Sequence, residues 1–346
     1  MKKSLKYIKS FLVFFFISGL SIGGIAFIYK SPPDFSGLSA FSIGAAFLIS
    51  ILSIYVEGER MRVIGIALNK KIPLKAALES IMGRELLSAI TPLGTGGQPL
   101  GIYILNRYGF SIGESVTISY LETFYTLLVL FTAGIVSLIV YSEVLESALL
   151  WGFLVWSFGS ILYFFFFSYF SISKPRILKK IGLKIIQFLS KIKIIKPHRI
   201  YSIKQHMIRE VKVFHTHIKD AIRTHWFIVI LLFIFSLAFW VLRFLSVYPI
   251  VLALGYKISL LELIAYQMII TSVNYFSVTP GSSGTTEGLG SVLFRVFIPI
   301  EAIPTFITLW RFFSYYLIIF LSGIGSLKII RFFIQEKKIE SDINTK

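Results

Sequence analysis

Two charged side chains lie several residues inside strongly apolar stretches of this sequence: Glu122 in residues 114–140 and Arg311 in residues 306–330. A charge at the centre of a lipid bilayer costs roughly 2.5–3.5 kcal/mol, so such residues usually face the interior of a helix bundle and pair. We therefore predict that Glu122 and Arg311 approach each other, either in a binding site or as a structural ion pair. Other charged candidates are Arg84, Glu85, Arg243, Glu262, Glu287 and Arg295.

Proline and glycine interrupt two apolar segments, at "TPLGTGGQPLG" (91–101) and "TPGSSGTTEG" (279–288). Proline removes a backbone donor and glycine loosens the backbone, so neither segment should form one continuous helix. Irregular backbone at membrane depth is tolerated only inside protein or beside a wet cavity. We therefore predict that residues 74–105 and 260–299 each enter the membrane and return as helix, break and helix. The breaks either bring helix ends to a central site or only allow close helix packing.

The sequence offers no pattern typical of covalent catalysis, nucleotide binding or metal binding. It contains no cysteine, and "GTGGQPLG" lacks the Gly-Lys-Ser/Thr ending of a phosphate-binding loop. All five histidines fall within positions 198–225, and His215 and His217 would point apart on a helix. We therefore expect no catalytic residue, no metal and no cofactor. We expect no nucleic-acid partner either, because no nucleic-acid-reading motif is present.

The composition of the chain is typical of an integral membrane protein. Of its 346 residues, 55% are hydrophobic and 15% are charged, and its mean hydropathy is +0.79, whereas soluble domains carry about 25% charged residues. A membrane-spanning helix needs about 20 apolar residues. We predict an all-α polytopic membrane protein, one membrane domain over 1–346, with about six spanning helices and two re-entrant broken helices. The predicted spans are about 11–29, 38–56, 114–140, 149–171, 226–252 and 306–330.

Positive charge is concentrated in residues 173–224, which carry 14 Lys and Arg against two acids in a chain of net charge +18. The positive-inside rule places this basic segment in the cytoplasm, and an even number of spans places both termini there too. Attraction of anionic lipid head groups is a compatible interpretation. Within it, residues 176–195 mix apolar residues with five lysines and suit an amphipathic helix in the membrane interface. We expect a multi-pass protein of the cell membrane.

Three blocks of sequence recur in the same order, at separations of 186 to 189 residues. The first block, "ALNKKIPL" at 67–74, matches "ALGYKISL" at 253–260 in five of eight positions. The two Thr-Pro motifs form the second block, and the predicted third and sixth spans form the last. The predicted topology gives the two units, about 38–140 and 226–330, opposite orientations. Inverted repeats with broken helices are typical of transporters.

The motifs "TPLGTGGQP", "TPGSSGTTEG" and "LWRFFSYY", with a glutamate in the predicted third span, together resemble a known family. It is the flippase-like transmembrane domain of lysylphosphatidylglycerol synthases, and the resemblance covers about 10–335. There are two departures: Thr123 stands where the family often has arginine, and "PGSSG" replaces a simpler Pro-Gly-Gly pattern. The site residues that the resemblance implies are Pro92, Gly96, Gly97, Glu122, Pro280, Gly281, Gly284, Glu287 and Arg311.

The resemblance implies a lipid translocator that moves an anionic or aminoacylated phospholipid, such as lysyl-phosphatidylglycerol, between leaflets. In the synthases, moving this lipid to the outer leaflet protects against cationic peptides. A separate soluble domain synthesises the lysyl-phosphatidylglycerol. We expect that domain to be absent here, because only a short tail follows the last predicted span. Arg295 and Arg311 are candidates for phosphate binding, since arginine binds phosphate through two donors. Glu122 and Glu287 would attract a cationic head group or balance the arginines.

Two alternatives to translocation remain open. The first is a membrane enzyme or enzyme subunit of lipid modification, acting in phosphatidylglycerol lysyl transfer or lipid-linked glycosyl transfer. The second is a non-transporting partner that anchors or regulates a separate envelope enzyme. Membrane phospholipids are the expected partners in the favoured case, with a separate lipid-modifying enzyme as a further candidate.

Overall fold

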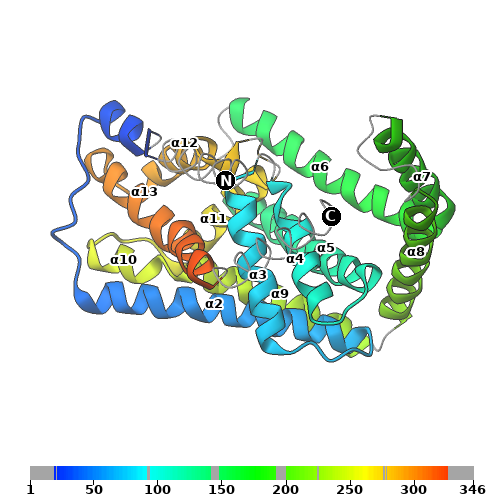
Figure 1. Cartoon of the computed structure of the whole chain (residues 1–346). Coiled ribbons are helices and arrows are strands. Elements are labelled where there is room, and N and C mark those ends of the chain that lie inside the picture. Colours follow the sequence, from blue (N-terminus) through cyan, green and yellow to red (C-terminus); the bar gives the residue numbers. More distant parts are fainter. Residues whose placement is uncertain are drawn as a thin grey trace, which may run out of the picture.

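The chain folds into a set of helices that surround two breaks (Figure 1). This structure is a computed structural model. The described residues form α-helices with short 3-10 and π turns and contain no strand, which confirms the all-α class for this part of the chain. The structure describes residues 19–20, 22–91, 94–141, 148–191, 200–223, 226–275, 277 and 279–325.

The first half of the chain places two helices before the first break and two after it. Ser39 begins the first of these helices by accepting a hydrogen bond from the backbone of Ser42. Ser111 and Glu114 begin the last one with a capping box, in which each side chain bonds the other residue's backbone N–H. The helices are α2 (Ala40–Ala67), α3 (Leu74–Ala89), α4 (Gly97–Arg107) and α5 (Ile112–Val140).

The second half repeats this order of long helix, shorter helix, break and further helices. The first two helices together form one apolar span, Trp226–Ala253. A capping box of Ser259 and Glu262 begins the next helix. The elements are α9 (Trp226–Leu245), α10 (Tyr248–Ala253), α11 (Leu260–Asn274), η4 (Pro280–Ser282), α12 (Thr285–Leu293), η5 (Phe294–Val296), η6 (Ile300–Ala302), α13 (Ile303–Arg311) and the π turn η7 (Phe312–Tyr316).

Positions that align between the two repeat units share local backbone geometry. Asn69 and Gly255 align, and both have positive φ, 53° and 75°, in the turns after α2 and α10. In each turn the next backbone N–H bonds to the carbonyl five residues before it, which is the Schellman pattern of helix ends. Helix α4 begins at Gly97 and α12 begins at Thr285, which also align. The internal repeat and its orientation in a membrane stay predictions.

Four helices within the described residues are long and apolar enough to cross a membrane. They correspond to four of the six predicted spans. The span predicted at 149–171 falls on the apolar helix α6 (Ala148–Ser173), and the span predicted at 11–29 lies partly outside the described residues. The sequence predicts that the second span ends at residue 56. Helix α2 itself continues to Ala67, and Glu57 and Arg60 in its last part are paired inside the protein.

The outer faces of the long helices are apolar, whereas polar side chains face inward. Phe41 and Leu48 of α2 are 85% and 66% exposed, and Val155 of α6 is 70% exposed. By contrast, Ser53 and Glu57 of α2 are 0–2% exposed. Exposed apolar surface of this extent marks contact with an apolar partner. The distribution is the one expected of helices surrounded by lipid.

The basic segment folds as two helices, α7 (Pro175–Lys191) and α8 (Ile200–Arg223), which pack against each other. They lie at the end of the molecule where α2 ends and α5 begins (Figure 1). The Glu210 carboxylate of α8 accepts a 2.7 Å hydrogen bond from the backbone N–H of Gly113 in α5. Glycine permits this approach, since a Cβ at position 113 would lie 2.6 Å from the Glu210 carbonyl oxygen. The basic segment is therefore docked on the helix bundle.

Candidate functional site

A polar cavity of about 540 Å³ lies where the two breaks meet the long helices. Helices α2, α3, α5 and α9 form its wall, together with residues of both breaks such as Gly94 and Gly281. Its volume falls in the range of about 300–1,000 Å³ that is typical of small-molecule sites. The charged residues that line it are Glu57, Arg60, Arg84, Glu85, Glu122, Arg243 and Arg311.

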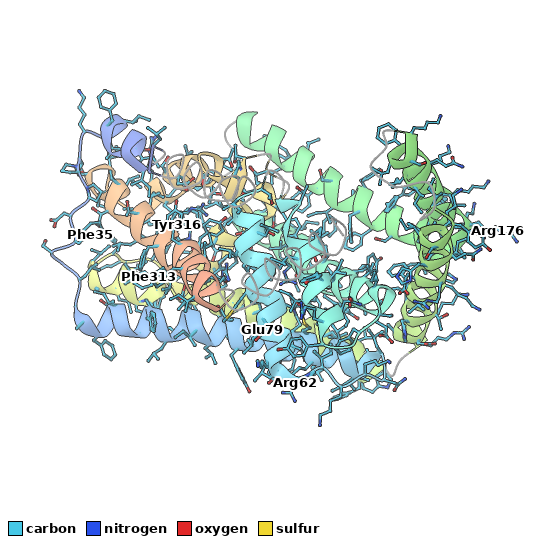
Figure 2. The ribbon with its side chains drawn as sticks, viewed as in Figure 1. Phe35, Arg62, Glu79, Arg176, Phe313 and Tyr316 are labelled. Atoms are coloured by element: carbon cyan, nitrogen blue, oxygen red, sulfur yellow. The ribbon has the colours of Figure 1, made fainter. Side chains whose placement is uncertain are left out.

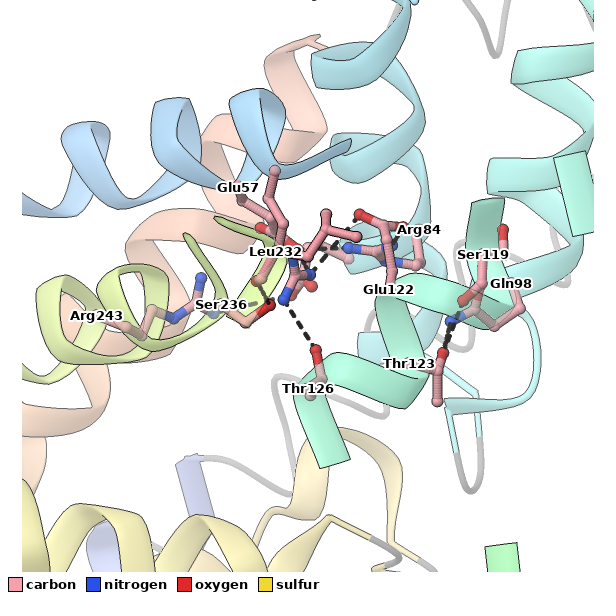
Figure 3. Close-up of polar contacts among 12 residues, drawn as sticks. Glu57, Arg84, Gln98, Ser119, Glu122, Thr123, Thr126, Leu232, Ser236 and Arg243 are labelled. Atoms are coloured by element: carbon pink, nitrogen blue, oxygen red, sulfur yellow. Dashed lines mark hydrogen bonds and ion pairs between the residues drawn. The ribbon is translucent and has the colours of Figure 1, made fainter. Parts of the chain in front are cut away.

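Arg84 on α3 lies between two buried carboxylates (Figure 3). Its Nη1 donates to Glu122 of α5, and its Nη2 donates to Glu57 of α2. Arg60 lies 3.7 Å from each of the same carboxylates and donates a 3.0 Å hydrogen bond to Thr126. Two cations thus face two anions within one network. Mutual pairing offsets the large cost of taking these charges out of water.

Arg243 on α9 is less completely paired than Arg84. Its Nη2 lies 3.8 Å from the carboxylate of Glu85, and its guanidinium carbon lies 5.8 Å from the ring centre of Phe239. Its Nη1 has no hydrogen-bond partner among the described protein atoms, although the residue is only 8% exposed. A buried donor left without a partner costs free energy. Arg243 also lines the cavity, so a loosely paired cation stands at its wall.

Arg311 is held against the second break by a carboxylate and a carbonyl group. Its Nε donates to Glu287 at 2.8 Å, and its Nη2 donates to the carbonyl oxygen of Gly281 at 3.0 Å. Glu287 also accepts a 2.7 Å bond from the backbone N–H of Gly284 and so caps α12. The guanidinium carbon of Arg311 lies 4.3 Å from the ring centre of Tyr315 in the π turn η7. Such turns are frequent at functional sites.

The predicted contact between Glu122 and Arg311 is wrong. Glu122 pairs with Arg84 and Arg60, whereas Arg311 pairs with Glu287. For these two residues, the counter-charge comes from the same half of the chain. Both side chains nevertheless line the same cavity. The structure therefore brings the two predicted residues into one site without a direct bond between them.

The model of the lysylphosphatidylglycerol synthase transmembrane region matches residues 7–322 of this chain. The chain belongs to this family. It is also similar to a UPF0104 membrane protein of Archaeoglobus fulgidus, with 27% identity over 284 residues, which cover 81% of this chain and 84% of that protein. The apolar helices and the family membership agree that this is a membrane protein, and the family is lipid-related.

In this member of the family, the glycines of the first break serve helix packing. A Cβ on Gly97 would lie 2.6 Å from the carbonyl oxygen of Arg84, and one on Gly96 would lie 2.8 Å from the Thr91 side chain. Both positions therefore let α4 and the break approach α3. Their role in a substrate site stays a prediction. The predicted site residue Pro92 lies outside the described residues.

The predicted residues of the second break have different positions relative to the cavity. Gly281 lines it, and its φ of 61° favours glycine. Pro280 begins the short η4 turn, Gly284 has a φ of 87°, and Glu287 is fully buried behind Arg311. These three residues shape the break or hold Arg311, and they are not among the residues that line the cavity.

Two other predicted candidates lie away from the cavity. Arg295 is exposed on η5 and is not among the residues that line it. The structure therefore does not bring Arg295 together with Arg311. The carboxylate of Glu262 accepts a hydrogen bond from the backbone N–H of Ser259 and so caps the N-terminus of α11. This capping role explains why a glutamate stands in an apolar segment.

Glu57 and Arg60 are central to the site, yet the sequence prediction omits them because it ends the second span at residue 56. The predicted internal repeat contains a signal for Glu57. Glu57 and Arg243 are 186 residues apart, the same separation as the first repeated block, and Glu122 aligns with Arg311 in the third. In the predicted repeat, opposite charges thus occupy aligned positions twice, and all four residues line the cavity.

Proposed function

We propose that this protein translocates a phospholipid between the leaflets of the membrane. The head group would occupy the charged cavity, and the acyl chains would remain in lipid. The charged cavity among helices with apolar outer faces is the observation that carries this proposal. Charged side chains at membrane depth are expensive and usually mark the path of a substrate or an ion. Membership in a lipid-related family supports the same conclusion.

An anionic or aminoacylated phospholipid, such as phosphatidylglycerol or lysyl-phosphatidylglycerol, fits the charges of the cavity. Four arginines and three glutamates line it, and Glu287 behind Arg311 supplies a fourth carboxylate. Arg243, which lines the cavity and has only a long ion pair, would contact the phosphate, with Arg311 as the second cation. The side chain of Glu85 is 23% exposed, whereas that of Glu122 is 2% exposed. Glu85 is therefore the carboxylate that an amino group of the lipid would reach first.

The two breaks suit transport if the repeat units have opposite orientations in the membrane. Transporters with inverted repeats bind substrate near the midplane, where broken helices meet, and they move one unit against the other. The breaks of this chain contribute Gly94 and Gly281 to one cavity. We propose that both broken segments are re-entrant, and that the termini and the basic segment are cytoplasmic, following the positive-inside rule.

The test is lipid exchange between leaflets in proteoliposomes. Head-group-labelled phosphatidylglycerol, lysyl-phosphatidylglycerol and a zwitterionic lipid are compared for the wild type and Arg243→Gln. Arg243 is a suitable site because its only described ion pair is long, at 3.8 Å, so the variant should fold. Arg295→Gln is the matched control, because it removes the same charge from an exposed position outside the cavity. We expect Arg243→Gln to slow exchange and Arg295→Gln to leave it unchanged.

Two outcomes would contradict the translocator. One is equal exchange by wild type, Arg243→Gln and empty liposomes. The other is no exchange by folded protein even under imposed proton or sodium gradients. The second outcome would favour a subunit of a lipid-modifying enzyme, because the family is described by the name of a synthase.

A further inference from the structure

Helix α7 keeps a row of large apolar side chains outside the packed interior. Ile177, Ile181, Ile185 and Phe188 recur at spacings of three or four residues and are 38–62% exposed. Residues at these spacings lie on one helix face. The four side chains, called here the α7 stripe, therefore form a continuous apolar strip along the helix.

A different face of α7 makes the contact with the rest of the protein. Ile186 is only 6% exposed. At Gly182 an added Cβ would lie 2.8 Å from the sulfur atom of Met207 in α8. The face of α7 that carries Gly182 and Ile186 therefore packs against the rest of the protein, and the α7 stripe stays exposed on another face.

The charges of α7 identify the kind of surface that its stripe fits. The helix contains no acidic residue. Lys180, Lys184 and Lys191 follow one another at helical spacing and are exposed beside the stripe. A cationic face next to an apolar face is the pattern of helices that lie in the interface of anionic membranes. Figure 2 shows Arg176, a further cation of α7, at the outer edge of the molecule.

The position of α7 fits the same surface. A single residue, Lys174, separates it from the apolar helix α6. In Figure 1, α7 and α8 run across the direction of the long helix α2, at one end of the molecule. We propose that α7 lies in the plane of the membrane, with the α7 stripe at the acyl boundary and its lysines on anionic lipid head groups. This proposal does not depend on translocation.

The test places a spin label on α7 of the full chain, which has no native cysteine. Ile185→Cys carries the label in the α7 stripe, and Gln187→Cys carries it at an exposed polar position of the same helix. Both are studied in vesicles of phosphatidylcholine with phosphatidylglycerol. We expect position 185 to be several-fold more accessible to oxygen, relative to a water-soluble nickel chelate, than position 187. Equal accessibility ratios at the two positions would overturn the proposal.

The role of charge is measured in the same vesicles. Lys180→Gln with Lys184→Gln should lower the accessibility ratio at position 185, since each lysine strengthens binding to an anionic surface about fivefold. Lys212→Gln with Lys219→Gln, at exposed positions on α8, is the matched control and should leave the ratio unchanged. The label at position 185 could also stay inaccessible to the nickel chelate in detergent, in a particle of the size of a dimer. That result would identify a second copy of this chain as the partner of the α7 stripe and would contradict the membrane assignment.

Discussion

Glu287 on α12 holds Arg311 on α13 through an ion pair of 2.8 Å, and neither residue is more than 5% exposed. Glu287→Ala should therefore leave Arg311 as a buried cation without its carboxylate partner. The loss of one partner from a buried pair costs about 3–5 kcal/mol. We expect a loss of this size in the free energy of unfolding, measured by denaturation in detergent micelles. The control, Glu301→Ala, removes an exposed carboxylate. Equal effects of the two changes would contradict the role of Glu287.

Arg84 and Glu122 should show strong energetic coupling, because Arg84 also pairs with Glu57. Arg84→Gln leaves two buried carboxylates close to each other, and Glu122→Gln then removes one of them. In a double-mutant cycle on unfolding free energy, we expect a coupling of about 1–3 kcal/mol. The same cycle on Arg62 and Glu59 should give at most about 1 kcal/mol, because the Arg62 side chain is 41% exposed. Additive effects at Arg84 and Glu122 would rule out the described pair.

Gly97→Ala should be strongly destabilising. Its Cβ would meet the backbone carbonyl oxygen of Arg84 at 2.6 Å, and backbone cannot move aside as a flexible side chain can. Gly288→Ala is the matched control, since a Cβ there has no neighbour within 4 Å and alanine is favoured in a helix by about 1 kcal/mol. Thermal unfolding should show a lower Tm for the first variant and an equal or higher Tm for the second. Equal Tm values would contradict the close approach of α3 and α4.

Residues 35 and 71 should lie on opposite sides of the membrane, because α2 connects the loops that contain them. Both positions are exposed, and the native chain is free of cysteine. Phe35→Cys should react with a membrane-impermeant maleimide from outside, and Lys71→Cys should react only from the cytoplasmic side. The cysteine-free parent controls for background labelling. Reaction of both variants from one side would contradict the proposed topology.

Much of the helical framework follows from hydropathy. The apolar runs predicted at 114–140 and 226–252 coincide with Ile112–Val140 and Trp226–Ala253. This agreement has a physical cause, since a chain in lipid must satisfy its own backbone and can do so only as helix or closed barrel. Hydropathy alone ends the second span near residue 56 and therefore leaves out Glu57, although α2 continues through it. Burial against a counter-charge on another helix keeps that residue inside.

The sequence predicted some of the charged residues of the candidate site but not how they pair. Charge inside apolar segments singles out Glu122, Arg84, Arg243 and Arg311 as candidates, and all four line the cavity. Their partners were not predictable in the same way, because pairing depends on where α3 crosses α5. In the predicted repeat, Glu122 and Arg311 occupy aligned positions, and aligned positions need not be in contact.

The sequence by itself determined that this chain is helical, apolar on its lipid-facing sides, interrupted at two Thr-Pro-Gly stretches and charged near the breaks. These properties depend on composition and local backbone preference. Only the tertiary structure decided that Arg84 bridges Glu57 and Glu122, that Glu287 holds Arg311, and that Arg243 keeps an unpaired donor. Those contacts join residues far apart in the chain, so they depend on how the helices cross.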